Sequence, residues 1–490
     1  MVSSRPRPVR WSRCGNSSAI DSRCGYVGGV ANQMNEVLDY LQANQSRFVD
    51  ELIEFVSIPS VSAQSKHRAD LKRAADWLVA QCRQIGLKVK LHKTAGNPII
   101  VATTRKSKKS TKPHYLVYGH YDVQPPEPFE LWETPPFQPT VVGDSLVGRG
   151  ASDNKGQHFA HLKAVEAFLA TGTDLPCDVT FLIEGEEEVG SESLETFLAK
   201  HRQEFDVDGV VVSDNGMPSL KHPALTYGLR GVVAFEIHLE GPNRDLHSGI
   251  YGGAVDNPAM VLSQLLAGMR DIDGKITVPG FYDGVEPLSD FEREQLGRYP
   301  ETEASLKRHL GVKGLFGESG YTPVEQRSAR PTLEINGLTS GYQGEGSKTI
   351  VPSRASAKVT CRLVPNQKPK QVLKAIQRHL KQHCPRSVKL TFEPGHAGEA
   401  YMTSPSGPQA QAATRALEQA FGRTPIMMRE GGSIPIVTDF KRILGADTLL
   451  LGLGLPDDNV HSPNEKVSLQ AIQLGMAMSA HLWAELGALK

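Results

Sequence analysis

The segment Tyr115–Gln124, with the sequence YLVYGHYDVQ, decides the fold. Apolar and aromatic residues run straight into Gly119 and His120, a pattern typical of a strand buried on both faces of a parallel sheet. Gly119 is expected to turn the chain at the end of the strand. His120 would then stand at the carboxyl edge of the sheet, where open α/β sheets bind ligands. Asp122 could hold or orient this histidine, although a hydrogen-bonded histidine in a turn explains the pair equally well.

Length and composition indicate a soluble globular protein of two domains. The 490 residues exceed what one ordinary hydrophobic core contains. Lys+Arg and Asp+Glu are equal at 54 each, so no net charge points to nucleic acid or to a membrane surface. Six cysteines without a CxxC pair are too few for a disulfide scaffold, which favours the reducing cytoplasm. No apolar run is long enough to span a bilayer.

The hydrophobic patterns divide the chain into four stretches. Residues 1–33 are basic and rich in Ser, Gly and Arg, which predicts a disordered tail, although an organellar transit peptide has a similar composition. Residues 34–226 and 401–490 predict two parts of one α/β domain with a mainly parallel sheet and helices on both faces. Residues 227–400 contain strands with a single apolar face, which predicts an inserted α+β domain of ferredoxin-like type that could close as a lid.

Acidic residues and histidines recur where the apolar strands end. Because the carboxyl ends of parallel strands meet at one edge of a sheet, these side chains are expected to lie together. Asp153 instead begins an amphipathic helix predicted from Asn154, where a carboxylate is favoured. Each residue alone could be a solvated acid or a capping histidine, but a surface charge run would not recur at strand ends. Five residues are therefore candidate metal ligands: His120, Asp153, Glu188, Asp214 and His461.

The candidate ligands predict the kind of metal and its chemistry. Two imidazoles and three carboxylates suit zinc first, then manganese or cobalt. Five ligands exceed the needs of one tetrahedral zinc, whereas two ions about 3.5–4 Å apart that share a carboxylate would use all five and leave room for a bridging water. Such a water loses its proton near neutral pH, and Glu187 could carry that proton to a leaving amine. No HExxH, GxSxG or phosphate-loop motif competes with this interpretation.

The motifs resemble those of the co-catalytic dinuclear zinc exopeptidases and deacylases. This family includes aminoacylases, succinyl-diaminopimelate desuccinylases, acetylornithine deacetylases and cytosolic nonspecific dipeptidases. The resemblance covers nearly everything from about residue 35 onward, and YGLRG, DLHSGIYGG and HSPNE are most similar to the dipeptidase branch. Asp153-Asn154 stands where the family often has two aspartates, so the bridging ligand is kept. The motifs occur in the family's order: GHYDVQP, GRGASDNKG, EGEEEVGS, VVSDN, YGLRG, DLHSGIYGG, RLVPN, REGGSIP and HSPNE.

The resemblance implies how the metal centre would be organised. His120 and Asp214 would bind one ion. Glu188 and His461 would bind the other, and Asp153 would bridge the two. Glu187 would be the general base for a hydroxide that bridges the metals, and Asp122 would orient His120.

The resemblance also implies residues that contact substrate from the inserted domain. His247 would reach the site of a neighbouring subunit, in a homodimer formed through the lid, and stabilise the developing oxyanion. Arg362 would pair with the free carboxylate of the substrate, and His396 and Ser433 would be further substrate contacts. Alternatively, His247 caps its glycine-rich loop and Arg362 is a solvated strand residue.

The sequence therefore predicts a cytoplasmic metallopeptidase that hydrolyses the amide bond of dipeptides or short peptides with a free C-terminal carboxylate. An N-acyl-amino-acid deacylase, either a deacetylase or a desuccinylase, would use the same dinuclear site with a different acyl pocket. A non-catalytic binding protein with the same fold is a third possibility, but a pure binder has no use for a base such as Glu187 beside its ligand.

Overall fold

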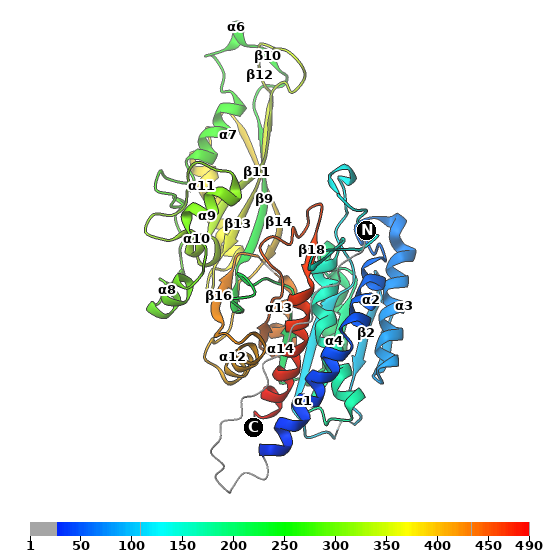
Figure 1. Cartoon of the computed structure of the whole chain (residues 1–490). Coiled ribbons are helices and arrows are strands. Elements are labelled where there is room, and N and C mark those ends of the chain that lie inside the picture. The colour runs from blue at the N-terminus through cyan, green and yellow to red at the C-terminus, as the bar shows by residue number, and fades with distance from the viewer. Residues whose placement is uncertain (1–26, 108, 433, 490) are drawn as a thin grey trace. The chain divides into compact units, whose positions relative to one another are not determined.

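The computed structural model describes residues 27–107, 109–432 and 434–489, which form two compact units (Figure 1). Unit 1 comprises three segments of the chain: the residues up to Tyr227, Thr403–Met427, and the residues from Asp439 onward. Unit 2 comprises Gly228–Met402 and Met428–Thr438. The sequence-based boundaries after residues 226 and 400 fall beside these crossings, whereas the return of Met428–Thr438 to unit 2 left no signal in the sequence.

The central sheet of unit 1 has a parallel middle and antiparallel edges. The pairs β6–β3, β3–β7 and β7–β17 are parallel. The pairs β1–β2, β2–β6 and β17–β8 are antiparallel. In spatial order the strands are β1 (Lys88–His92), β2 (Ile99–Thr103), β6 (Asp178–Glu184), β3 (His114–His120), β7 (Gly209–Val212), β17 (Thr448–Leu450) and β8 (Ala224–Leu229).

Both faces of β3 are covered, which explains its continuous apolar sequence. Tyr115 and Val117 belong to the large core that the helices of unit 1 share. Tyr118, on the opposite face, packs against Phe440 with ring centroids 5.5 Å apart. The predicted fold class is therefore confirmed. The helices of unit 1 are α1 (Val27–Ala43), α2 (Gln45–Val56), α3 (Arg68–Gln84), α4 (Gln157–Thr171), α5 (Glu192–His201), α12 (Pro408–Phe421) and α14 (Leu469–Gly487).

Two expectations about the first α/β segment were wrong in detail. Gly119 does not turn the chain, because it lies inside β3; a Cβ atom there would stand 2.7 Å from Cβ of His158, so the position has no space for a side chain. The helix after Asp153 is not amphipathic, since all residues of α4 from Gln157 to Phe168 are buried. A helix buried on every side packs between other elements, and α4 contacts α14 and α1 as well as β3.

The predicted tail of residues 1–33 lies mostly outside the described residues, and α1 begins at Val27, before the expected end of that tail. None of the described helices is long and apolar enough to cross a membrane. Several short elements complete unit 1 or lie where the chain passes between the units: η1 (Ser65–His67), η2 (Phe129–Leu131), β4 (Thr140–Val142), β5 (Ser145–Val147), η3 (Ala151–Gly156), η4 (Glu187–Val189), η5 (Arg202–Glu204), β15 (Tyr401–Met402), β16 (Ile426–Glu430), α13 (Pro435–Asp439), η6 (Phe440–Leu444) and β18 (Lys466–Ser468).

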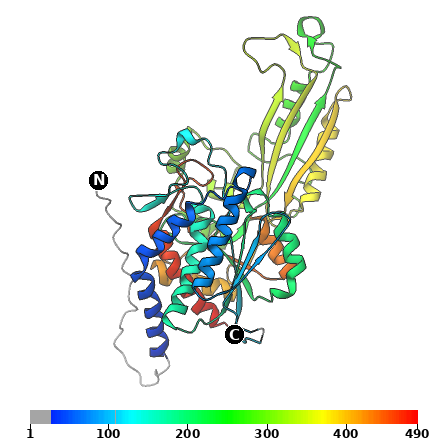
Figure 2. The ribbon, with the colours of Figure 1, turned by 90° about the vertical axis from the view of Figure 1, so that its right-hand side faces the viewer.

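Unit 2 is built on an antiparallel sheet with the order β11-β13-β9-β14. Helices α7 and α11 pack on one face of this sheet and share a core with it (Figures 1 and 2). The order of strands and helices along the chain makes this a split βαβ arrangement, as expected. Its elements are β9 (Gly231–Glu240), β10 (Leu246–His247), α6 (Ser248–Tyr251), α7 (Pro258–Ala267), β11 (Thr332–Ser340), β12 (Ile350–Val351), β13 (Arg354–Leu363), α11 (Pro369–His383) and β14 (Lys389–Gly398).

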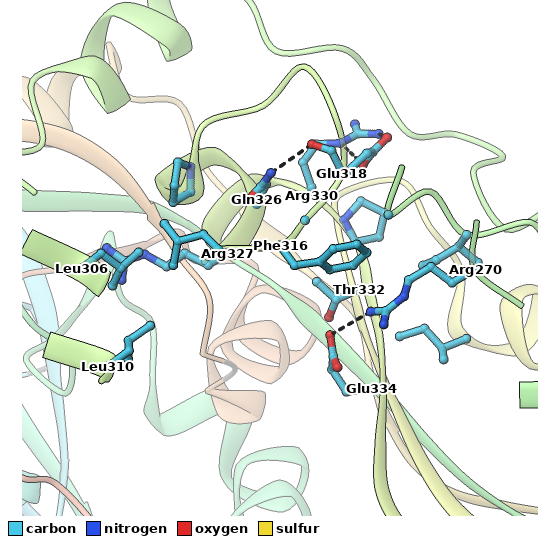
Figure 3. A pocket seen from close by; sticks show the side chains of 17 residues that line it. Arg270, Leu306, Leu310, Phe316, Glu318, Gln326, Arg327, Arg330, Thr332 and Glu334 are labelled. Atoms are coloured by element: carbon cyan, nitrogen blue, oxygen red, sulfur yellow. Dashed lines mark hydrogen bonds and ion pairs between the residues drawn. The ribbon is translucent and has the colours of Figure 1, made fainter. Parts of the chain in front are cut away.

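Three helices inserted between α7 and β11 were not predicted, and two of them, α8 (Asp290–Gly297) and α10 (Pro323–Ala329), share a small core. The third, between them in the chain, is α9 (Glu303–Leu310). Beside them lies a pocket of about 260 Å³ (Figure 3). Two of its charged side chains already interact with other residues of the lining. Arg330 makes two 2.8 Å hydrogen bonds to Glu318, and the guanidinium of Arg270 lies 4.7 Å from the ring centroid of Phe316. None of the predicted site residues lines this pocket.

Candidate metal centre

All five candidate ligands lie in unit 1, on segments that follow its strands or precede its central helix. His120 is the last residue of β3, and Asp214 comes shortly after β7. Glu188 lies in η4, which follows β6, and His461 lies in the loop between β17 and β18. Asp153 has an extended backbone inside η3, ahead of α4. The parallel strands therefore deliver their carboxyl ends to one edge of the sheet, as the sequence predicts.

The side chains of these residues converge on Asp153. Its Oδ1 is 3.2 Å from Nε2 of His120, and its Oδ2 is 2.9 Å from Nε2 of His461. Nε2 of His461 is also 3.4 Å from Oε2 of Glu188, and Nε2 of His120 is 3.6 Å from Oδ1 of Asp214. The Nε2 atom of each histidine thus faces Asp153 and one further carboxylate, which is the connectivity expected of two cation positions that share Asp153.

Ligand atoms of three of these residues, His120, Asp153 and Glu188, lie within 4.8 Å of one another. The environment of His120 favours a cation at this place. The ring is fully buried, and its Nε2 has no hydrogen-bond partner in the described part of the chain, although two carboxylates face it. A buried polar atom without a partner is costly, and imidazole nitrogen with carboxylate oxygen is a donor set that suits zinc. The residues present therefore fit a divalent metal.

The charges in the centre are out of balance when no cation is bound. Burial raises the pKa of Asp214 and of Glu188, because it disfavours the charged carboxylates. Hydrogen bonds to Asp153 and Glu188 raise the pKa of His461 to about 10. Burial would lower the pKa of His120, but the charge of Asp214 and the carboxylates of Asp122 and Asp153 together raise that pKa well above the ordinary value. The carboxylates of the centre therefore favour positive charge beside them, which a divalent cation would supply.

Glu187, the candidate base, stands directly before the candidate ligand Glu188. Burial raises the pKa of Glu187 well above its ordinary value, and the carboxylates of Asp214 and Glu188 add to the effect while His120 opposes it. A carboxyl group with a raised pKa, beside a cluster of ligands, has the property that proton transfer near neutral pH requires.

Asp122 holds more of the centre than the sequence predicts. Its carboxylate is fully buried, with Oδ1 3.4 Å from Nδ1 of His120, and its backbone carbonyl lies 3.1 Å from the same ring nitrogen. That Asp122 orients His120 stays a prediction. The two carboxylate oxygens of Asp122 also accept the backbone N–H groups of Glu187 at 3.3 Å and of Glu188 at 3.1 Å. Asp122 therefore links His120 to the turn that carries Glu187 and Glu188.

Sequence reasoning missed other residues that support the ligands. Asn154 donates to Oδ1 of Asp214 at 2.6 Å, and Gln124 donates to Oε2 of Glu188 at 2.7 Å. Both stand inside motifs quoted above, immediately beside or close to a ligand, and that proximity was the only signal available. The Asp153–Asn154 peptide bond is cis.

The expected substrate contacts lie in unit 2, apart from Ser433, which is outside the described residues. His247 is exposed at the end of β10, and its Nδ1 accepts the backbone N–H of Gly249 at 3.0 Å, so the predicted capping alternative is present. Arg362 is half-buried on β13, and burial lowers the pKa of its guanidinium. His396 is exposed on β14. The roles of these residues in substrate binding stay predictions.

Comparison with known proteins adds independent evidence. Residues 116–485 match peptidase family M20/M25/M40. The Cys-Gly metallodipeptidase dug1 of Schizosaccharomyces pombe is 32% identical over 91% of this chain and 96% of its own length. The human Beta-Ala-His dipeptidase is 34% identical over 89% of each chain. The solved structure of the di-peptidase Dug1p from Saccharomyces cerevisiae superposes with a TM-score of 0.80 at 30% identity, covering 93% of this chain and 99% of that one.

Proposed function

The chain belongs to peptidase family M20/M25/M40, and from this premise we propose that it hydrolyses the amide bond of dipeptides or short peptides with a free C-terminal carboxylate. The sequence-based identification of a metal-dependent peptidase is confirmed. The observation that carries the proposal is the position of Asp153 between two histidines, each of which faces a further carboxylate. The names of the related dipeptidases support the choice of substrate.

We propose that two divalent ions, zinc most readily, are held in this centre. His120 and Asp214 would hold one, Glu188 and His461 the other, and Asp153 both. When bound, the ions would polarise the scissile carbonyl and make water acidic enough to lose its proton near neutral pH. The excess of carboxylates, and the buried Nε2 of His120, support this assignment.

The chain's own residues would move the proton. Glu187 would take a proton from the attacking water and deliver it to the nitrogen of the leaving amine. Its raised pKa suits both halves of this transfer, because a base with an ordinary carboxyl pKa would not protonate an amine efficiently near neutral pH. Asp122 would keep Glu187 in place through the backbone N–H that it accepts.

The substrate contacts proposed for unit 2 are His247, Arg362 and His396, and Ser433 is proposed with them. The resemblance to dipeptidases supports a homodimer formed through unit 2, in which a second copy supplies His247 to stabilise the developing oxyanion. The exposure of the His247 loop, which includes Ile250 at 69% and Tyr251 at 41%, leaves it accessible to such a copy. A cytoplasmic location is proposed as well, and the free thiols of Cys82, Cys177, Cys361 and Cys384 are compatible with it.

Hydrolysis of unmodified dipeptides tests the proposed function. We expect the purified chain to cleave Ala–Ala, Cys–Gly and β-Ala–His, and to leave N-acetyl- and N-succinyl-amino acids intact. A chelator should abolish the cleavage and added zinc should restore it, because the proposed chemistry needs the cation. Cleavage of the acylated amino acids alone would identify a deacylase. Cleavage that is insensitive to the chelator would contradict the metal centre.

Replacing Arg362 by methionine tests the proposed contact with the substrate carboxylate. A charge-assisted hydrogen bond contributes about 1.5–3 kcal/mol, so KM for a free dipeptide should rise by about 10- to 150-fold while kcat changes less. The same dipeptide with an amidated C-terminus lacks the carboxylate and should be cleaved equally by wild type and variant. Arg354→Met, an exposed arginine on the same strand, is the matched control and should leave KM unchanged.

A further inference from the structure

Glu465 is a buried carboxylate that gathers four hydrogen-bond donors from a single turn. Its Oε2 accepts Nη1 of Arg149 at 2.7 Å and the backbone N–H of Gly150 at 2.9 Å. Its Oε1 accepts the backbone N–H groups of Ser152 and Asp153, each at 3.0 Å. Both Glu465 and Arg149 are at most 1% exposed. The three backbone donors form a concave anion-binding arrangement around the carboxylate.

This contact joins two segments that are remote in sequence and carry neighbouring ligands. Asp153 is the last residue of the turn around Glu465, and His461 stands four residues before Glu465. The side chains of Asp153 and His461 lie 2.9 Å apart although 308 residues separate them. Glu465 binds the backbone beside the first ligand and belongs to the loop that carries the second.

The loop around His461 needs such an anchor. The side chain of His461 is 54% exposed, so packing does little to hold it. Its backbone has a φ of +63°, and Asn459 and Asn464 in the same loop have φ values of +54° and +62°. Residues other than glycine keep this left-handed conformation only where the surroundings enforce it. Asn464 supplies some of these contacts, through a hydrogen bond to the carbonyl of Leu131 and one from the backbone N–H of Glu133. The buried residues that flank His461 supply others.

Asp458 provides a second link between the same two segments, but with a different geometry. Its Oδ2 accepts both the hydroxyl of Ser152 at 2.9 Å and the backbone N–H of Leu455 at 2.8 Å. Its Oδ1 is buried and has no hydrogen-bond partner among the residues that the structure describes. Asp458 thus uses one oxygen where Glu465 uses two.

We propose that Glu465 is a positioning residue of the metal centre, whose carboxylate holds the turn of Asp153 and the loop of His461 together so that both ligands are in place before a cation binds. This inference rests on the proposed metal centre and goes beyond it, since Glu465 is not itself one of the ligands. Outer groups that fix metal ligands typically contribute about 10- to 100-fold to metal affinity.

The two-oxygen geometry makes a sharp test possible. A glutamine at position 465 has one accepting oxygen and one donating NH2 group. In either orientation, the NH2 group would face two donors, either those of Arg149 and Gly150 or those of Ser152 and Asp153. The amide therefore loses two hydrogen bonds and leaves the buried charge of Arg149 without its partner. Asparagine at position 458 would keep both hydrogen bonds of Asp458. Its amide oxygen can accept the hydroxyl of Ser152 and the backbone N–H of Leu455, and its NH2 group replaces Oδ1, which makes no hydrogen bond to the described residues.

The experiment measures zinc affinity on the full-length chain after the metal has been removed, by competition with a chromophoric chelator. We expect Glu465→Gln to bind zinc about 10- to 100-fold more weakly than wild type, and Asp458→Asn to bind it as wild type does. Glu166→Gln controls for lost stability, since Glu166 is another buried, paired glutamate, and its partners Tyr40, Arg47 and Lys163 lie outside the centre. It should lower the unfolding temperature without weakening zinc binding.

Equal zinc affinity for wild type and Glu465→Gln would overturn the proposal, as would an equal loss in Glu166→Gln. If Glu465→Gln does not fold, the double variant Arg149→Gln/Glu465→Gln removes the unpaired charge but still turns an amide toward backbone donors, so zinc binding should remain weakened; wild-type affinity in the double variant would overturn the proposal. A wild-type chain that takes up no zinc would overturn the metal centre itself, and the role of Glu465 with it.

Discussion

Replacing Glu187 by glutamine is expected to lower kcat about 10²- to 10⁴-fold, which is the usual contribution of general acid–base catalysis. The amide keeps the size of the side chain but can neither take up nor release a proton at neutral pH. Because Glu187 is not one of the five proposed ligands, metal content should stay at the wild-type level. Steady-state kinetics on a dipeptide, with metal analysis of the same sample, measures both quantities.

The neighbouring residue provides the matched control for this prediction. Glu186 belongs to the same acidic run, but its Oε1 accepts the backbone N–H of Asn97 at 3.1 Å, a contact that an amide oxygen would keep. Glu186→Gln should therefore retain wild-type kcat. Unchanged turnover in Glu187→Gln would refute its role as the base, and loss of metal from that variant would mean that Glu187 is a ligand instead.

Replacing Asp153 by alanine is expected to have the larger effect on the metal centre. Asp153 is the one candidate ligand that faces both histidines, so its loss should weaken both cation positions. We expect the variant to be purified with little or no metal and to lose about 10³-fold or more in kcat/KM, since the electrophilic contribution of the ions disappears with them. Asp174→Ala, which removes an exposed surface ion pair with Lys112, should retain metal and activity.

The stability of metal-free protein gives a second measurement on Asp153→Ala. Contacts with Asp153 and Glu188 raise the folded-state pKa of His461 to about 10, above the ordinary value near 6.5. A raised pKa of this kind stabilises the fold fully below about pH 6.5 and ceases to do so as the pH rises through 10. The unfolding temperature of metal-free wild type should exceed that of Asp153→Ala most at pH 6, and the difference should shrink toward pH 10. A constant difference would contradict the ion pairing.

Much of the centre could be predicted from sequence because it follows from one topological rule. Parallel strands place their carboxyl ends at the same edge, so His120, Glu188 and Asp214 had to meet if their strands were neighbours. The loop after a further apolar strand, β17, added His461 to this set by the same pattern, and the family resemblance of the motif HSPNE agreed with it. The assignment to a family of metallopeptidases is confirmed.

The contacts that support the ligands could not be predicted, because they are made by backbone groups and by residues remote in sequence. Asp122 accepts hydrogen bonds from the backbone N–H groups of Glu187 and Glu188. These bonds depend on the backbone conformation of a turn, which cannot be inferred from the pattern of side chains in the sequence. The same is true of Glu465, whose partner Arg149 is 316 residues away. The prediction that helix α4 is amphipathic failed for another reason. Its polar residues suggested a solvent-exposed face, but Lys163 and Glu166 are buried and form an ion pair with each other.

The joining of remote segments by Glu465 has a consequence for how the protein is made. During synthesis the nascent chain emerges with its N-terminal part first, and β3, with His120, is complete long before the ribosome reaches the loop of His461. A chain interrupted before that loop would lack one ligand and the anchor of the Asp153 turn together. Chains that terminate before Glu465 should therefore be inactive. Hydrolytic activity is expected only after translation has passed Glu465.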